Sequence, residues 1–232
     1  MASLDYLLDP PDTCDWVQAP PWPLLIFLHG SGERQNGLRE VRKHGPPKLR
    51  EERKTHPFNG SFPFVLISPK CSEDKMWHYP DMLDKLEKLL DKVKAVTQID
   101  PTRIYLTGWS MGGFGAMSLA LRCPEQFAAL AVVSTGCYEL QKISEKDDEK
   151  KKQILAPIKS LPIRVYFAAN DQVAFAAKYT IPLITDLQRH CVGFEHVSPF
   201  AKDPDEEAHV MACERAYRNN ELYRWFLKFK NE

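Results

Sequence analysis

A serine between small residues follows a short apolar stretch near the middle of the chain. Residues 108–112 read Gly-Trp-Ser-Met-Gly, and the run 114–121 behind them has a helical pattern. A strand, then Gly-x-Ser-x-Gly, then a helix is the context of a nucleophile elbow, where the serine lies on a tight bend. The glycines remove side chains that would collide where strand and helix converge. We therefore predict that Ser110 is a nucleophile; the alternative is a serine that caps a helix.

A serine hydroxyl is a weak nucleophile and needs a base that is itself oriented by a third group. In chains with this elbow, the acid and then the histidine follow the serine. Asp171 comes directly after an apolar run that ends at residue 169, where a sheet can present a carboxylate. It is the predicted acid, against the alternative of a turn aspartate. Asp186 falls inside a helical pattern and Asp205 in a charged loop, so both are weaker candidates.

The chain offers seven histidines as the base. His209 lies 38 residues after Asp171, which leaves room for one helix, one strand and a loop. We predict His209 as the base and keep His196, at the last strand, as the alternative. For each of them the ordinary alternative is a surface or capping histidine. The remaining histidines either precede the serine or end a helix: His29, His44, His56, His78 and His190.

Acyl transfer also needs hydrogen-bond donors where the oxyanion forms. One donor is predicted to be the backbone N–H of Met111, the residue after the nucleophile. The second should come from a loop behind an earlier strand, and residues 27–32, Phe-Leu-His-Gly-Ser-Gly, fit that description. We assign the Ser31 backbone N–H, with Gly32 as the alternative. His29 is expected to brace this loop.

These residues must be positioned by a sheet, and the apolar patterns supply one. Short apolar runs predict strands at 23–28, 62–68, 104–106, 130–134, 163–169 and 194–197. Three- and four-residue apolar spacing predicts helices at 81–97, 112–122, 174–190 and 221–230. Strands that alternate with helices favour a mainly parallel central sheet with helices on both faces, an α/β fold.

The chain is expected to form a single domain over residues 1–232, since no repeat or linker divides it. Residues 139–156 break the strand–helix rhythm and hold the mixed charges of 145–152. Such a run is usually a solvated surface insertion, and the sharper alternative is a lid over a site.

The bulk composition limits the function classes. Lys plus Arg and Asp plus Glu number 31 each, so the formal net charge is zero and predicts neither a nucleic-acid partner nor an anionic membrane surface. The N-terminal residues lack the pattern of a signal peptide, and the apolar runs are too short to span a bilayer. Six scattered cysteines form no zinc-like spacing. We expect free thiols, no metal and a cytoplasmic location.

Four stretches together resemble one protein family: 28–34, 100–108, 110–113 and 222–227. They are similar to the predicted-peptidase/esterase branch of the α/β-hydrolases, which includes relatives of phospholipase/carboxylesterases, dienelactone hydrolases and feruloyl and polyhydroxybutyrate esterases. The resemblance extends from about residue 6 to 227. It implies the α/β-hydrolase fold, a triad on Ser110, Asp171 and His209, and hydrolysis of small-molecule acyl esters without a cofactor.

The walls of the substrate pocket are less determined by sequence. Trp77, Trp109 and Phe175 lie close to the predicted chemistry and are the candidates for substrate binding; core packing is the alternative for each. A serine carboxylesterase is the favoured function. A thioesterase, lysophospholipase or peptidase would use the same triad, and a non-catalytic binding protein on a hydrolase fold is the remaining alternative.

Overall fold

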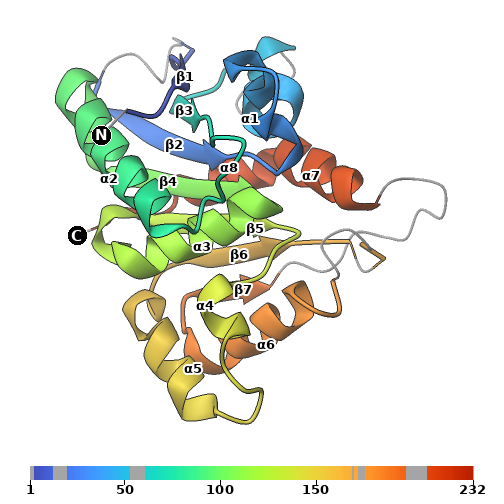
Figure 1. Cartoon of the computed structure of the whole chain (residues 1–232). Helices are drawn as coiled ribbons and strands as arrows, with labels where there is room; N and C mark the ends of the chain where they lie inside the picture. Colours follow the sequence, from blue (N-terminus) through green and yellow to red (C-terminus); the bar gives the residue numbers. More distant parts are fainter. Residues whose placement is uncertain are drawn as a thin grey trace.

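A seven-stranded sheet with helices on both faces organises the protein (Figure 1). The computed structural model describes residues 3–12, 20–52, 61–168, 170–171, 176–196 and 208–231. The strands are β1 Tyr6–Asp9, β2 Trp22–Leu28, β3 Val65–Pro69, β4 Ile99–Trp109, β5 Ala129–Val133, β6 Ile163–Tyr166 and β7 Phe194–His196. The α-helices are α1 Gly45–Glu51, α2 Pro80–Val96, α3 Met111–Arg122, α4 Tyr138–Gln141, α5 Asp148–Leu155, α6 Thr180–His190, α7 Ala208–Arg218 and α8 Asn220–Phe226. Four 3₁₀ turns complete the described elements: η1 Gly32–Arg34, η2 Leu38–Lys43, η3 Pro124–Gln126 and η4 Ala156–Ile158.

The strand order is β1-β3-β2-β4-β5-β6-β7. Every neighbouring pair is parallel except β1 with β3, which is antiparallel. The prediction of a mainly parallel sheet is therefore confirmed. Sequence reasoning missed β1, because its Tyr-Leu-Leu-Asp is too short to show a period.

Alternation along the central strands divides the core into two clusters. In β2, Leu24, Ile26 and Leu28 pack on one face, while Leu25 and Phe27 pack on the other. All five are buried, which explains why the strand reads as one continuous apolar run. A sheet that is apolar on both faces must be covered on both.

Different helices cover the two faces. Apolar side chains of α2, α3 and α6 join the cluster that contains Leu24, whereas those of α1, α7 and α8 join the cluster that contains Phe27. Figure 1 shows α2 and α3 in front of the sheet, with α7 and α8 behind it. The helices α1 and α7 were not predicted by period, since α1 has Pro at its start and seven residues, and α7 follows a polar segment.

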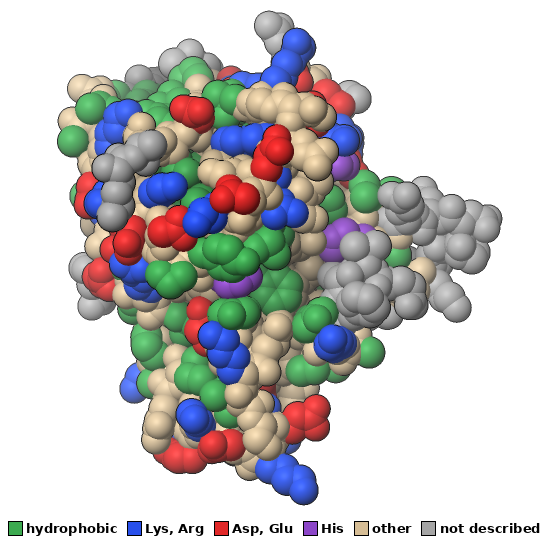
Figure 2. Space-filling model, in the orientation of Figure 1, with side chains coloured by type: hydrophobic (Ala, Val, Ile, Leu, Met, Phe, Trp, Pro, Cys, Tyr) green, Lys and Arg blue, Asp and Glu red, His purple; other side chains and the backbone are tan. Residues whose placement is uncertain are grey.

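The charged segment predicted at 139–156 holds most of α4, all of α5 and the first residue of η4. Lys151 is buried and bonds Asp186 of α6, while most of the other charged residues in this segment are exposed. The segment thus packs onto α6 through the inner face of α5. On the side of the molecule shown in Figure 2, cationic and anionic side chains lie interspersed.

The five described cysteines, Cys71, Cys123, Cys137, Cys191 and Cys213, are free and buried. Burial raises the pKa of the Cys71 thiol to about 12, so that thiol is protonated at neutral pH. The expectation of free thiols is confirmed for these five. Within the described ranges, none of the helices has the length and apolar character needed to cross a membrane.

The edge formed by the carboxyl ends of the parallel strands holds the segments that are predicted to carry the chemistry. Here β2 leads into the 29–34 loop, β4 into Ser110, β5 into Thr135 and β6 toward Asp171. Parallel strands bring their carboxyl ends to the same edge, where ligands bind in open α/β sheets. Residues far apart in sequence are thereby gathered at one place.

Close packing between β2, β4 and α3 predicts a sharp difference between two glycine substitutions. A Cβ added at Gly112 would lie 1.8 Å from the backbone oxygen of Leu28, whereas one at Gly32 would meet no atom within 4 Å. We expect Gly112→Ala to lower the free energy of unfolding by about 3 kcal/mol or more, because backbone must move. Gly32→Ala, the matched control, should change it by less than about 0.5 kcal/mol. Urea unfolding of both variants tests this, and equal stabilities would contradict the close approach.

Candidate active site

Ser110 lies on a strained bend between β4 and α3. Its φ of 55° and ψ of −121° fall in a region that non-glycine residues rarely adopt. Its N–H donates to the Val133 oxygen of the neighbouring strand at 2.9 Å, which fixes the bend to the sheet. A Cβ at Gly108 would lie 2.2 Å from the Gly112 oxygen, so the strand and helix approach more closely than side chains allow. The predicted strand–serine–helix bend is present.

The helix behind the serine directs its free amides toward the bend. Its first intrahelical bonds run from the N–H groups of Gly113 and Phe114 to the Ser110 oxygen, at 2.9 and 3.2 Å. Thr135 donates its hydroxyl to the same oxygen at 3.1 Å. The N–H of Met111 lies before these bonds, at the positive end of the helix dipole. It is therefore placed to donate a hydrogen bond to an anion.

Asp171 and His209 meet although 38 residues separate them. The Nδ1 atom of His209 lies 2.8 Å from Oδ2 of Asp171, and both side chains are buried, with 7% and 1% of their surface exposed. A carboxylate only accepts hydrogen bonds, so Nδ1 carries the proton and donates it. This leaves Nε2 of His209 as the basic nitrogen. His209 is the second residue of α7, and Asp171 follows β6.

Trp109 contacts three parts of the site: the histidine, the bend and the loop that carries Ser31. Its ring lies 5.1 Å from the ring of His209, between centroids, and it directly precedes Ser110. On other sides it meets the ring of His44 at 4.8 Å and the backbone at Gly30, where an added Cβ would lie 3.0 Å from the indole. One rigid side chain therefore contacts the histidine, the bend and the loop that carries Ser31.

The loop that carries Ser31 is held by two cations. Arg34 donates from Nε to the Ser31 oxygen at 3.1 Å and from Nη1 to the Glu73 and Lys75 oxygens. Lys70 donates from Nζ to the backbone oxygens of Glu33, Gln35 and Gly37. Ser31 itself is exposed and precedes η1, with φ −72° and ψ −29°. Its amide is thus presented on a firmly anchored turn.

His29 braces the same loop, as predicted. Its Nε2 accepts the N–H of Cys71 at 3.0 Å, and its Nδ1 donates to the Gly30 oxygen at 2.7 Å. The indole N–H of Trp77 donates to the His29 backbone oxygen at 3.0 Å. Burial lowers the pKa of His29 to about 4, so the ring is neutral at physiological pH. A neutral, doubly bonded imidazole is a structural group.

The imidazole that packs on Trp109, that of His44, is itself held by charged side chains. The ring of His44 lies between two carboxylates, with Nε2 3.6 Å from Glu33 and Nδ1 3.8 Å from Glu214. Burial raises the pKa of Glu33, while hydrogen bonds, chiefly from His44, lower the pKa of Glu214 to about 2. Glu214 also pairs with Lys48 at 2.7 Å, so it links α7 to α1.

The predicted substrate-binding aromatics have different positions. Trp77 is fully buried and packs against Gly115 of α3, so its surface is used inside the protein. Trp109 is 6% exposed and lies beside His209. Phe175 falls outside the described residues, and so does the side chain of His196, the alternative base.

Sequence reasoning missed several residues that hold the site. Lys70, Thr135 and His44 act through neighbours distant in the chain, so no local pattern marks them. Arg34 lies in the motif 28–34, and that position was the available signal, although no role for Arg34 follows from sequence alone. No group of His, Cys, Asp and Glu among the described residues could hold a metal ion.

Comparison with known proteins assigns the family. The model of a family described as putative esterase matches residues 63–183, just over half of the chain. The chain belongs to this esterase family. The match includes Ser110 and Asp171, and it ends before His209.

Two curated proteins are similar to parts of the chain. Poly(3-hydroxyalkanoate) depolymerase C of Paucimonas lemoignei is 37% identical over 124 residues, which are 50% of this chain and 28% of that protein. Lysophospholipase-like protein 1 of Mus musculus is 33% identical over 127 residues, which are 47% of this chain and 52% of that protein. The chain therefore spans about a quarter to a half of the length of these relatives.

Solved structures share the fold. A thermostable esterase matches with a TM-score of 0.72 and 23% identity, covering 98% of this chain and 59% of the other. The S-formylglutathione hydrolase of Staphylococcus aureus matches with a TM-score of 0.65 and 15% identity, covering 97% and 90%. The esterase-family chain thus has the predicted α/β-hydrolase fold.

The neutral state of His29 predicts a pH-dependent stability. Its pKa is about 4 in the folded protein, against an ordinary value of 6.5 for the unfolded chain. Between these values the unfolded chain binds more protons, so stability falls with falling pH. We expect His29→Gln to be less stable than wild type at pH 7.5, and this deficit should shrink by up to about 3 kcal/mol by pH 4. Urea unfolding at both pH values measures it; a deficit independent of pH would contradict a buried neutral His29.

Proposed function

We propose that this protein hydrolyses carboxylic esters, with Ser110 as nucleophile, His209 as base and Asp171 as the acid that orients the base. The observation that carries the proposal is the buried 2.8 Å contact between His209 and Asp171. It lies against Trp109, the neighbour of a serine held at positive φ. A strained, partly exposed serine and an imidazole oriented by a buried carboxylate are the groups that together activate a hydroxyl.

The proposed cycle uses groups of this chain and water. Nε2 of His209 takes the Ser110 proton as Oγ attacks the ester carbonyl. Asp171 holds the imidazole and stabilises its charged form. His209 then gives the proton to the departing alcohol, and the acyl group remains on Ser110. A water molecule gives a proton to the same nitrogen as it attacks the acyl-enzyme, and His209 returns that proton to the Ser110 oxygen as the acid is released.

The N–H groups of Met111 and Ser31 are the proposed oxyanion donors. The free amide at the start of α3 supports the first, and the anchored turn before η1 supports the second. Their value comes from being fixed in advance, since donors that need not reorganise stabilise developing charge most strongly. Arg34 and Lys70 supply that rigidity for Ser31.

Membership of an esterase family supports ester hydrolysis over a purely binding role. The names of the similar proteins, a depolymerase and a lysophospholipase-like protein, leave the size of the acyl substrate open. Thioesters and peptides remain substrates for the same triad. We propose small acyl esters, with Trp109 near the reacting carbonyl.

Substitution of the triad tests the proposal. We expect Ser110→Ala to lower kcat/KM for 4-nitrophenyl acetate at least about 10³-fold, because it removes the nucleophile, and Asp171→Asn about 10³–10⁴-fold, because an amide no longer holds His209 in the tautomer that leaves Nε2 basic. Ser118→Ala, a buried serine on the same helix, is the matched control and should keep wild-type rates. Equal rates in wild type and Ser110→Ala would exclude the proposed nucleophile.

A proline substitution tests the second oxyanion donor. Ser31 already has a proline-compatible φ of −72°, so Ser31→Pro removes the N–H with little change in backbone angle. We expect kcat to fall about 10²–10³-fold, as for loss of one donor. Ser31→Ala keeps the amide and should retain most of the activity. If both variants lose activity equally, the side chain rather than the N–H is responsible, and the assignment is wrong.

A further inference from the structure

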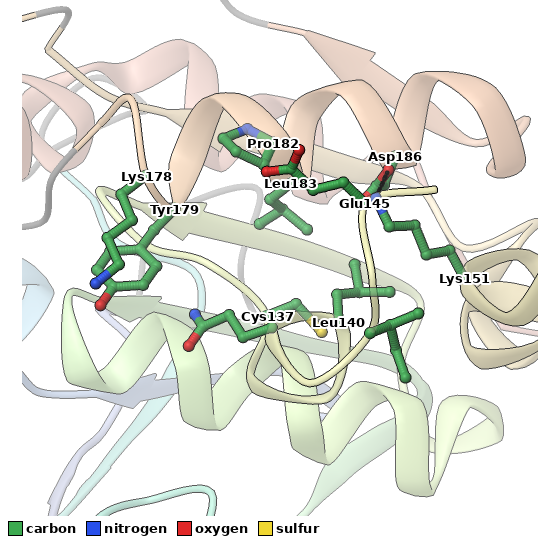
Figure 3. A pocket seen from close by; sticks show the side chains of 11 residues that line it. Cys137, Leu140, Glu145, Lys151, Lys178, Tyr179, Pro182, Leu183 and Asp186 are labelled. Carbon is green, nitrogen blue, oxygen red and sulfur yellow. Dashed lines mark hydrogen bonds and ion pairs between the residues drawn. The ribbon is translucent and has the colours of Figure 1, made fainter. Parts of the chain in front are cut away.

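A cavity lies between the 137–145 segment and α6 (Figure 3). Its volume is about 360 Å³, within the range of small-molecule pockets. None of the proposed triad or oxyanion residues lines it. Its apolar floor consists of Cys137, Leu140 and Leu183, all buried.

One end of this cavity reaches the first turn of α3. Tyr179 and Gln141 line it there, and both lie against Gly136, where an added Cβ would meet them at 3.1 and 3.0 Å. Phe114 lies against the same glycine, and its ring packs on Tyr179 with centroids 5.8 Å apart. Since the N–H of Phe114 bonds the Ser110 oxygen, this end adjoins the nucleophile's helix.

The other end holds a buried ion pair. Lys151 of α5 donates from Nζ to Oδ1 of Asp186 on α6 at 3.0 Å, and the two side chains are 11% and 6% exposed. Figure 3 shows this pair at the end opposite to Lys178 and Tyr179. Among the described residues this is the one hydrogen bond made by the Lys151 ammonium, which has three donors. A buried donor and a buried acceptor thus stand side by side.

The charges that line the cavity and the adjacent donor and acceptor determine which chemical group can bind there. The cavity is lined by two carboxylates, Glu145 and Asp186, and by two ammonium groups, Lys151 and Lys178, so its lining has no net charge that would favour a charged occupant. A neutral group that both donates and accepts, such as a hydroxyl, can bond both partners without adding charge. The apolar floor between the two ends suits a hydrocarbon stem.

We propose that this cavity is a substrate subsite that takes one arm of the ester, an apolar chain ending in a hydroxyl group. The arm extends from the reacting carbonyl past Tyr179 and Gln141, and its hydroxyl bonds Lys151 and Asp186. The proposal rests on ester hydrolysis at Ser110 as proposed above. It assigns a role to the α4–α5 segment: that segment forms one wall of the substrate site.

The test compares matched pairs of esters that differ in one terminal group. The hydroxyl is placed on the acyl arm, as in 4-nitrophenyl 6-hydroxyhexanoate against the hexanoate, or on the alcohol arm, as in 6-hydroxyhexyl acetate against hexyl acetate. We expect kcat/KM of the wild type to be about tenfold higher for the hydroxylated member of one pair, the effect of one well-placed hydrogen bond to a charged group. Terminal carboxylate and ammonium analogues should show no gain.

Two variants and one control place that preference in the cavity. Lys151→Met/Asp186→Leu removes both charges together, so neither is left buried alone, and should abolish the preference for the hydroxyl. Lys152→Met/Glu149→Leu removes an exposed pair on the same helix and should keep it. Leu183→Trp fills the floor and should slow both long esters about tenfold. Hydrolysis of 4-nitrophenyl acetate should be unchanged in the Lys152→Met/Glu149→Leu control.

The outcomes separate this inference from the function on which it rests. No hydroxyl preference in the wild type for either arm, or a preference that survives in the Lys151→Met/Asp186→Leu variant, would overturn the subsite. Unimpaired turnover of long esters by Leu183→Trp would do the same. Failure of the wild type to hydrolyse 4-nitrophenyl acetate, with no reaction of Ser110 with a fluorophosphonate, would instead overturn the proposed function.

Discussion

The close approach of three backbone segments is the constraint on which the site depends. Gly112 of α3 packs against the Leu28 oxygen at the end of β2, and Gly108 of β4 packs against Gly112. Only with no side chain at either position can α3 begin directly above the sheet edge. The same approach forces Ser110 to positive φ and leaves the first amides of the helix free. Backbone strain and the proposed catalytic geometry therefore have one origin.

The polar side chains that stabilise this arrangement are either uncharged or hydrogen-bonded, which lowers the cost of burying them. His29 is held uncharged between a donor and an acceptor, and Glu33 is shifted toward its protonated form by burial. By contrast, Lys70 donates to backbone oxygens of the loop, and Arg34 donates from the loop to the backbone oxygen of Glu73. Trp109 contacts the loop, the bend and His209 at once, so it fixes their positions relative to one another.

Sequence patterns predicted the sheet and the bend well because their causes are local. Apolar runs predict β2 and β5 because both faces of these strands are covered, and Gly-x-Ser-x-Gly predicts the bend. Chain order was enough to choose Asp171 and His209, which the structure brings together. The pairing of Lys151 with Asp186 could not be predicted, since a mixed-charge run reads as a solvated face and the partner lies 35 residues away. The support of Trp109 by His44 is non-local in the same way.

Covalent labelling tests most directly whether His209 makes Ser110 nucleophilic. Wild-type protein is treated with a fluorophosphonate, and the adduct is followed by intact mass and located by peptide mapping. We predict one adduct per chain, on Ser110, formed far more slowly in His209→Ala. An adduct on another residue, or equal labelling rates in wild type and His209→Ala, would contradict it.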